Sequence, residues 1–315
     1  MSKLAAVPRF LTPLALLAAV LALALPSGAV AHRSDVLLAV LVLATALGIP
    51  AVELARLRAQ ATAVALLSVL PFLVLGAIGW ALGRAFGAGE VRDGLLACGL
   101  SSSEVAAVGL VALAGADAAI ALGAVMGSLI VAAVFGPLAI AWLGGGVHVD
   151  GGALLGRFAL VVLAPLAAGV GLRTVIPALG AVDEQREGVA AVAVVALVYA
   201  SLSGERGAHR LGLAIGAGAA FLACSAMVAA AWRSRVSGRA GTAGAFAIGM
   251  RDFAVAAALA TQAFGPAAGV VPGVYGVLML IAGSAAAGRL RSVGRTSGAH
   301  QVCSGPAQIS GSDGP

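Results

Sequence analysis

The chain has 315 residues, of which 61% are hydrophobic and only 10% are charged, with a formal net charge of +6. This is far more apolar sequence than the core of a soluble domain needs, which argues against a soluble globular protein. The positive charge does not indicate a nucleic-acid-binding protein, because the Lys and Arg residues fall between apolar runs and form no single basic patch. Composition therefore predicts an all-α polytopic membrane protein.

Apolar stretches long enough to cross a bilayer as helices recur along most of the chain. They predict about ten transmembrane helices in two sets of five, and the matching position and depth of charged residues in the fourth span of each set predict two inverted repeats. The expected organisation is a cytoplasmic N-terminus over 1–9, a first repeat over 10–143, a second repeat over 144–291 and a disordered tail over 292–315. The expected spans are 10–30, 35–54, 61–82, 92–113, 118–143, 152–172, 188–203, 208–232, 240–264 and 267–290.

The first span follows Lys3 and Arg9 and ends at Ala29-Val30-Ala31, which resembles a signal-peptidase site. Cleavage there would leave about nine spans, but we expect retention, because the apolar stretch exceeds an ordinary signal core and two equal halves are then kept. Lys and Arg residues are more numerous on the amino-terminal side of the predicted spans than on the opposite side. The positive-inside rule therefore predicts a multi-pass protein of the inner or plasma membrane with both termini in the cytoplasm.

Ionisable residues deep inside the spans are the first candidates for a functional site. Arg251 and Asp252 lie side by side in the ninth span, within AFAIGMRDFAVAAALA, and Glu104 lies at a matching depth in the fourth span. Charge near the bilayer centre is costly unless it is paired or hydrated, so such residues usually mark a substrate or ion pathway. The alternative is mutual neutralisation in a water-filled crevice without transport.

Small and hydroxyl-bearing residues beside these charges predict interruptions in both helices. Gly99 and Gly249 lower helix propensity, and the hydroxyls of Ser101, Ser102 and Ser103 can satisfy backbone groups that an interruption frees. Two interrupted helices at matching depth could cross at the membrane midplane, as in transporters built from inverted repeats. Ordinary hydrogen bonding of the serines to carbonyls within a packed helix is the alternative interpretation.

No motif indicates an enzyme or a bound cofactor. The sequence has no HExxH, no recognisable pair of catalytic aspartates and no serine-lysine pair within one span. Cys98, Cys224 and Cys303 are isolated, so they indicate neither a metal site nor a disulfide framework. Asp117 precedes a long apolar run and is expected to cap the fifth span, with metal binding as a weaker alternative.

Three short stretches resemble the bile acid:sodium symporter family. The stretch from Gly99 to Glu104, Gly-Leu-Ser-Ser-Ser-Glu, is similar to that family's Gly-Gly-x-x-Ser-Asn, with glutamate in place of asparagine. The run GADAAIALGAVMGSLIVAAVFGP is similar to the family's passage into the fifth span and ends at Pro137. The stretch from Ala247 to Asp252 stands where the family usually has Glu-x-Gly-x-Gln-Asn, and it keeps only the glycine.

The resemblance implies a secondary transporter that moves a small organic anion by alternating access. Spans one, two, six and seven would form a panel, and the core would contain the broken fourth and ninth spans. The residue changes argue against conventional coupling to two sodium ions, because Ala247 replaces the glutamate, Arg251 replaces the glutamine and Ser128 is the hydroxyl kept in the fifth span. Sodium or a proton stays open as the coupling ion. We hypothesise that Glu104 or Asp252 takes up a proton during transport.

Arg251 has two interpretations. It could supply fixed positive charge at a former cation site, with Glu104 and Asp252 as partners, or it could bind the anionic substrate directly. A non-transporting membrane sensor or scaffold with the same fold is the alternative function. The expected partners are a small organic anion and membrane lipid, not nucleic acid, and the oligomeric state stays open. The residues expected to line the substrate or ion pathway are Ser101, Ser102, Ser103, Glu104, Ser128, Gly249, Arg251 and Asp252.

Overall fold

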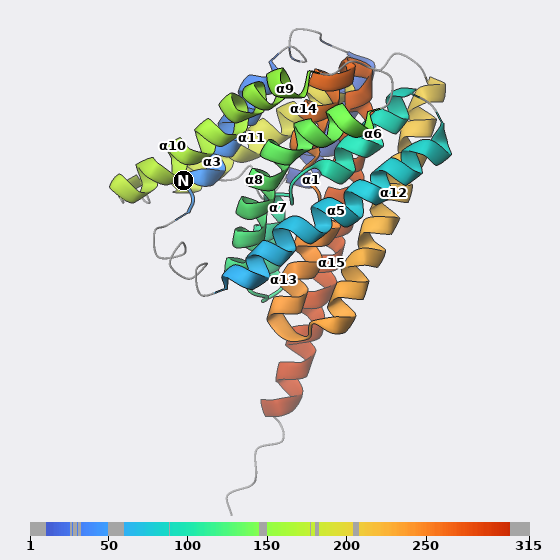
Figure 1. Ribbon diagram of the computed structural model, residues 1–315. Helices are drawn as coiled ribbons and strands as arrows, with labels where there is room; N and C mark the ends of the chain where they lie inside the picture. Colours follow the sequence, from blue (N-terminus) through green and yellow to red (C-terminus); the bar gives the residue numbers. More distant parts are fainter. Residues whose placement is uncertain are drawn as a thin grey trace, which may run out of the picture.

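The fold is helical throughout the part of the chain that the structure covers. The computed structural model describes residues 11–25, 27, 30, 33–49, 60–87, 89–144, 150–176, 178–179, 183–203 and 208–302. These residues contain no β-strand apart from one isolated bridge. Six helices among them are long and apolar enough to cross a membrane. Together they form the elongated bundle of a multi-pass membrane protein (Figure 1).

The helices follow the predicted spans closely, with a break inside two of them. The first half contains α1 (Leu11–Ala24), α3 (Ser34–Ala46), α5 (Ala61–Phe86), α6 (Gly89–Leu100), α7 (Ala106–Leu113) and α8 (Ala118–Leu143). The second half contains α9 (Gly151–Phe158), the π-helical turn η2 (Ala159–Leu163), α10 (Ala164–Val175), α11 (Asp183–Leu202), α12 (Ala208–Arg235), α13 (Gly238–Gly249), α14 (Phe253–Phe264), the 3-10 turn η4 (Pro266–Gly269) and α15 (Val270–Val302).

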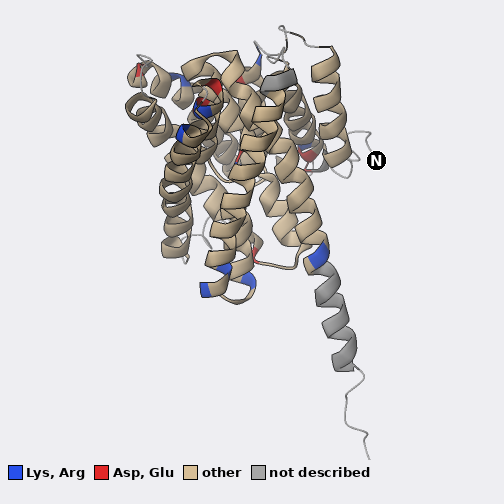
Figure 2. Ribbon diagram, turned by 90° about the vertical axis from the view of Figure 1, so that its right-hand side faces the viewer, with Lys and Arg blue, Asp and Glu red and all other residues tan. Residues whose placement is uncertain are grey.

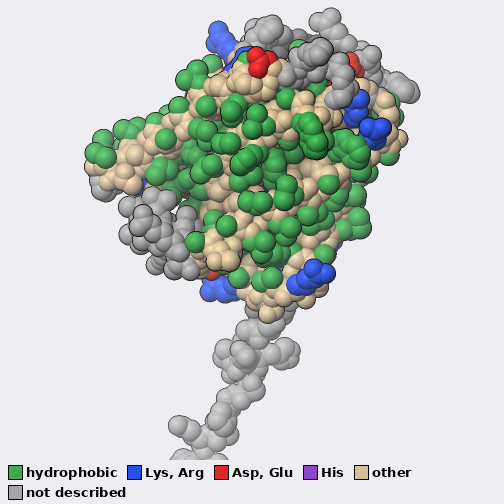
Figure 3. Space-filling view, in the orientation of Figure 1, with side chains coloured by type: hydrophobic (Ala, Val, Ile, Leu, Met, Phe, Trp, Pro, Cys, Tyr) green, Lys and Arg blue, Asp and Glu red, His purple; other side chains and the backbone are tan. Residues whose placement is uncertain are grey.

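Apolar side chains cover the outside of the bundle, and glycines let some of its helices approach closely inside. Hydrophobic side chains spread over the face shown in Figure 3, and the coloured Arg residues lie toward the ends of the bundle in Figure 2. Inside, α5 and α6 touch at the backbone: a Cβ atom on Gly79 would lie 2.4 Å from the carbonyl oxygen of Leu95, and one on Gly99 would lie 2.3 Å from that of Leu75. Close approach through glycine is how helices associate in lipid, where no hydrophobic effect drives them together.

The helices pack as two groups. One group, which we call the panel, consists of α1, α3, η2 with α10, and α11, which contact one another. The other, which we call the core, consists of α5 to α8 and α12 to α15. Between the groups, α1 and α11 contact α15, and α3 and α11 contact α14. The membership of the panel agrees with the division implied by the family resemblance.

The end of the chain differs from the sequence-based expectation. A tail without regular structure was expected from residue 292, but α15 continues to Val302. No proline interrupts the chain between Pro272 and Pro306, so nothing forces the helix to stop at the change in composition. Residues 1–9, 303–315, Ala29 and Ala31 lie outside the described residues. The division into two inverted repeats of about five helices stays a prediction.

Candidate ion and substrate site

Two helix interruptions meet inside the core. Residues 101–105 separate α6 from α7, and residues 250–252 separate α13 from α14. The two linkers run antiparallel, and Ser103 and Arg251 form an isolated β-bridge. Both interruptions therefore occur in the stretches where the sequence predicts them, and they cross each other.

Backbone hydrogen bonds between the two linkers hold the crossing together. The amide of Glu104 donates to the carbonyl of Met250 at 2.9 Å, and the amide of Asp252 donates to the carbonyl of Ser102 at 2.8 Å. A broken helix frees polar backbone groups that cannot stay unpaired in an apolar interior. Each linker supplies the partners that the other one needs, which explains why the interruptions occur together.

Ser103 and Ser128 connect the crossing to the neighbouring helices. The Ser103 hydroxyl donates to the carbonyl of Ala247 on α13 at 2.7 Å, and the Ser103 amide donates to the hydroxyl oxygen of Ser128 on α8 at 2.9 Å. The Ser128 hydroxyl donates in turn to the carbonyl of Val125 at 3.1 Å. Both side chains are buried, and both hydroxyl protons are used within the protein.

The other two serines differ from each other. The Ser101 hydroxyl donates to the carbonyl of Cys98 at 2.8 Å, as in an ordinary packed helix end. The Ser102 hydroxyl is buried without a hydrogen-bond partner. Ordinary hydrogen bonding to a carbonyl of the same helix thus explains Ser101. It does not explain Ser102, whose hydroxyl has no hydrogen-bond partner.

The two acids occupy equivalent places but have different surroundings. Asp252 precedes α14, and its Oδ1 accepts hydrogen bonds from the amides of Ala254 at 2.9 Å and Val255 at 3.0 Å. Glu104 lies at the start of α7, where its Oε1 accepts one longer bond from the amide of Ala106 at 3.4 Å. The second oxygen of Glu104, Oε2, is buried and has no hydrogen-bond partner. Both carboxylates therefore face helix N-termini, where negative charge is favourable, and Asp252 accepts more and shorter hydrogen bonds there than Glu104 does.

Arg251 is fully buried, and its guanidinium has no hydrogen-bond partner among the described residues. Its electrostatic neighbours are Tyr275, Asp252 and Cys98. None of the ion pairs in the described part of the chain joins Arg251 to Glu104 or Asp252, so the expected direct pairing is not present. The physical reason is that both carboxylates turn toward the amides at the starts of α7 and α14.

Two residues that sequence reasoning missed complete the crossing. Tyr275 on α15 accepts a hydrogen bond from the Arg251 amide at 3.0 Å and donates to the carbonyl of Gly249 at 3.4 Å. Ser225 on α12 also donates to the Gly249 carbonyl, at 3.3 Å. The signal that could have found Tyr275 is a tyrosine in an otherwise apolar span, since a buried phenol needs a partner. No comparable signal distinguishes Ser225.

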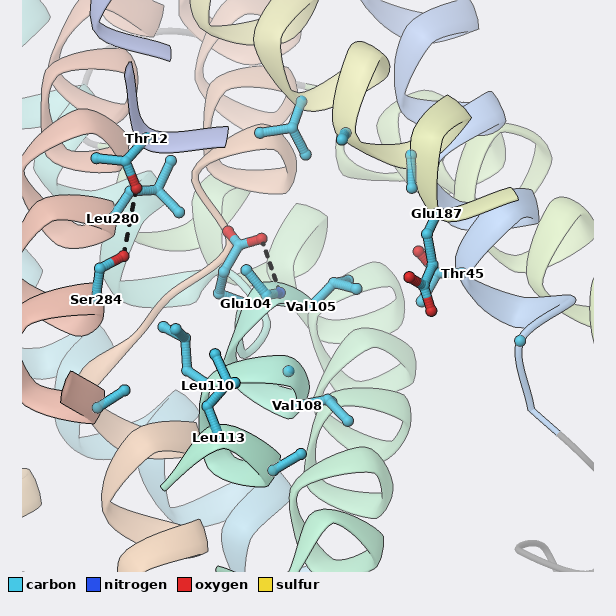
Figure 4. Close-up of a pocket in the computed structure, with 18 of the residues that line it drawn as sticks. Thr12, Thr45, Glu104, Val105, Val108, Leu110, Leu113, Glu187, Leu280 and Ser284 are labelled. Carbon is cyan, nitrogen blue, oxygen red and sulfur yellow. Dashed lines mark hydrogen bonds between the residues drawn. The ribbon is translucent and has the colours of Figure 1, made fainter. Parts of the chain in front are cut away.

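A cavity of about 890 Å³ reaches the crossing from one end of the bundle. It lies between panel helices α1, α3 and α11 and core helices α7, α8 and α15 (Figure 4). Glu104 and Val105 line it at the crossing, and Arg186 and Glu187 line it at the start of α11. Most of the other lining side chains are apolar. Of the predicted site residues, Glu104 alone lines the cavity.

Arg186 is the cation among the lining residues, and it is already engaged. Its Nη1 donates to the carbonyl of Ala44 at 3.0 Å and its Nε donates to Asp183 at 3.3 Å, while Nη2 lies 3.6 Å from Glu187. Arg186 therefore ties α11 to the end of α3. Among the residues that line the cavity, Glu104 is the one with a buried side-chain atom, Oε2, that has no hydrogen-bond partner.

Asp117 acts as a helix cap. Its Oδ1 accepts hydrogen bonds from the amides of Ala119 at 3.1 Å and Ile120 at 3.2 Å, which confirms the expected N-cap of α8. Among the described residues there is no group of three or more His, Cys, Asp and Glu side chains that could hold a metal ion. Asp117 therefore has a structural role in this arrangement.

The core contains two crossed helix interruptions with buried charges, and a cavity lies between the two helix groups. This arrangement is typical of membrane transport proteins. The sequence model of the SBF-like CPA transporter family matches residues 9–291, and the chain belongs to this family. The match confirms the resemblance to bile acid:sodium symporters that the three short stretches carry. No curated protein matches the chain.

Proposed function

We propose that the protein is a secondary active transporter that moves a small organic anion by alternating access, coupled to protons rather than to sodium. The observation that carries this proposal is the cavity of about 890 Å³ that ends at Glu104. Its size is within the range of small-molecule sites, roughly 300 to 1,000 Å³, and its walls are mostly apolar. A solute with an apolar body and one polar group would fit such a space.

Proton coupling is favoured over sodium coupling by the chemistry of the crossing. Sodium sites in transporters use carbonyl and side-chain oxygens of interrupted helices. Here the Ser128 oxygen already accepts a hydrogen bond from the Ser103 amide, and the fully buried guanidinium of Arg251 supplies positive charge nearby, which disfavours a second cation. We assign Arg251 the fixed-charge role, since it does not line the cavity.

Glu104 is the better of the two acids for carrying the proton. Asp252 is occupied by capping α14, whereas Glu104 lines the cavity and keeps Oε2 free. A buried carboxyl oxygen without a partner holds a proton at lower free-energy cost than a charge. Protonated Glu104 would also donate a hydrogen bond to an anion in the cavity, whereas ionised Glu104 would repel it. Proton and anion would thus bind together.

The direction of the cavity fits an inward-open state. It extends toward Arg186, on the side that the distribution of Lys and Arg assigns to the cytoplasm. We therefore infer a multi-pass protein of the inner or plasma membrane with both termini in the cytoplasm. In this orientation the cavity would release substrate into the cell.

Uptake into proteoliposomes under separately imposed proton and sodium gradients tests the proposal. We expect a proton gradient to drive accumulation of a candidate organic anion and a sodium gradient to have no effect. Glu104→Gln should abolish the dependence on the proton gradient, because glutamine donates a hydrogen bond without titrating. Uptake that ignores pH and rises with sodium would contradict the coupling, and no flux under either gradient would favour a sensor or scaffold.

A further inference from the structure

A polar cluster joins three helices on the side of the crossing away from the cavity. Asp35 in the first turn of α3 accepts a hydrogen bond from Nε2 of Gln262 at 2.7 Å through its Oδ1. Its Oδ2 accepts two bonds from Arg157, from Nε at 2.9 Å and from Nη2 at 2.6 Å. We call these three residues the Asp35 cluster.

The Asp35 cluster and the cavity lie on opposite sides of the crossing. The cavity is lined by Leu41 and Thr45 in the second half of α3 and by Gly48 and Ile49 just after it, whereas Asp35 lies at the other end of that helix. Helix α14 starts at the crossing with Asp252 as its cap, and Gln262 lies in its last turn. The cavity extends from the crossing along α7. The Asp35 cluster lies at the end of α14 that is remote from the crossing.

The cluster connects the panel to the core. Asp35 belongs to panel helix α3, and Gln262 belongs to core helix α14, which contacts α3. Between the cluster and the crossing, the side chains of Leu38 on α3 and Ala258 on α14 are buried, at 0% and 2% exposure. The two groups are packed together here, whereas on the cavity side a space of about 890 Å³ lies between them and they meet at α15, where the hydroxyls of Thr12 and Ser284 lie 3.3 Å apart.

We propose that Asp35 is the latch of the transport cycle, holding α14 against the panel so that the side opposite the cavity stays closed. The inference rests on the proposed function, because a latch has meaning only if the protein alternates between two open sides. Release of Gln262 from Asp35 would let α14 move away from α3. The buried side chain of Ala258 on α14 would then be exposed to water. Arg157 is a positioning residue, since it binds Oδ2 and leaves Oδ1 directed at Gln262.

The chemistry of the cluster suits a contact that must form and break. A hydrogen bond to a charged carboxylate is stronger than one between neutral groups, and the Asp35 side chain is only 25% exposed, which limits screening by solvent. Gln262 is neutral, so its release leaves no unpaired charge on α14. Asp35 would keep its ion pair with Arg157 in both states.

Accessibility of cysteine reporters in the full-length protein tests the latch without knowledge of the substrate. In a background without the native cysteines, Ala258→Cys reports the path beside α14, and Ala190→Cys reports the cavity that Ala190 lines. The protein is reconstituted in lipid nanodiscs and labelled with a membrane-impermeant maleimide, and the rate at each site is followed by intact mass. Wild-type protein should label fast at 190 and slowly at 258.

Weakening the latch should reverse this pattern. We expect Gln262→Ala, and more strongly Gln262→Glu, to raise the labelling rate at 258 about tenfold and to lower the rate at 190. Gln185→Ala is the matched control, because Gln185 is an exposed glutamine on α11 away from the cluster. In the double variant that combines Asp35→Asn with Q262E, the asparagine amide on α3 can donate to the glutamate carboxylate on α14. Labelling at 258 and 190 should therefore return toward the wild-type rates.

The outcomes separate the latch from the proposed function. Unchanged labelling at 258 in both Gln262 variants, with monodisperse folded protein on size exclusion, would overturn the latch. Equal labelling of Q262E and the double variant D35N/Q262E would also overturn it, because a structural disturbance alone predicts no rescue. If wild-type protein shows no flux under either gradient, the proposed function fails, whatever the labelling shows.

Discussion

Glu104 and Asp252 show how the same residue chemistry takes two roles at one crossing. Each acid precedes a half-helix, but Asp252 accepts hydrogen bonds from two amides of α14, whereas Glu104 accepts one longer bond from an amide of α7. Sequence depth predicted that both acids belong to the site. It could not distinguish them, because the direction of a side chain depends on partners that the fold supplies.

Substitutions at Asp252 should separate capping from charge. Asp252→Ala removes the cap of α14 and should lower the free energy of unfolding by about 0.5–2 kcal/mol. Asp252→Asn should cost little, because asparagine is an equally good N-cap. Thermal unfolding of the purified variants checks this. Equal losses for both substitutions would show that the charge of Asp252, and not its cap, stabilises the crossing.

At the scale of helices, contact between α5 and α6 positions the linker that carries the serines and Glu104. The helices approach through Gly79 and Gly99, where an added Cβ would meet carbonyl oxygens of the opposite helix. Gly99 is two residues from Ser101, so this contact fixes the place where α6 ends. The sequence suggested Gly99 as an interruption point, and the structure adds its close approach to Leu75.

Gly99→Ala should therefore destabilise the protein. The methyl group would clash with the Leu75 carbonyl, and we expect a loss of about 1–3 kcal/mol and a displaced linker. Gly171→Ala on α10 is the matched control, because a Cβ atom there has nothing within 4 Å and alanine favours the helix. The two variants are compared by thermal unfolding. A loss at Gly171 as large as that at Gly99 would show that close packing at α6 is not the cause.

For the whole molecule, the sequence predicted most of the architecture and only part of the site. Continuous apolar stretches located the helices, and glycines and serines beside intramembrane charges located both interruptions. The Asp35 cluster was not predictable, because Asp35, Arg157 and Gln262 are distant in the chain and lie in different helices. The extension of α15 was missed because Ser and Gly were weighed as tail composition, although no proline ends the helix.

The two sides of the molecule together support alternating access. A cavity lies between the panel and the core on one side of the crossing, where α1 and α11 still contact α15, and the Asp35 cluster joins the two groups on the other side. Glu104 lies where the cavity meets the crossing, so in the proposed mechanism a proton on Glu104 would be exchanged with only one side at a time. Such one-sided access is the requirement for coupling a proton gradient to a solute.

Proton movement driven by an anion gradient tests this account most directly. Proteoliposomes containing a pH-sensitive dye, in sodium-free buffer, receive an inward gradient of each candidate organic anion. The account predicts acidification of the lumen with wild-type protein, and none with Glu104→Gln although the anion itself still enters. Anion entry without proton movement in wild-type protein, or equal acidification with the variant, would contradict proton coupling at Glu104.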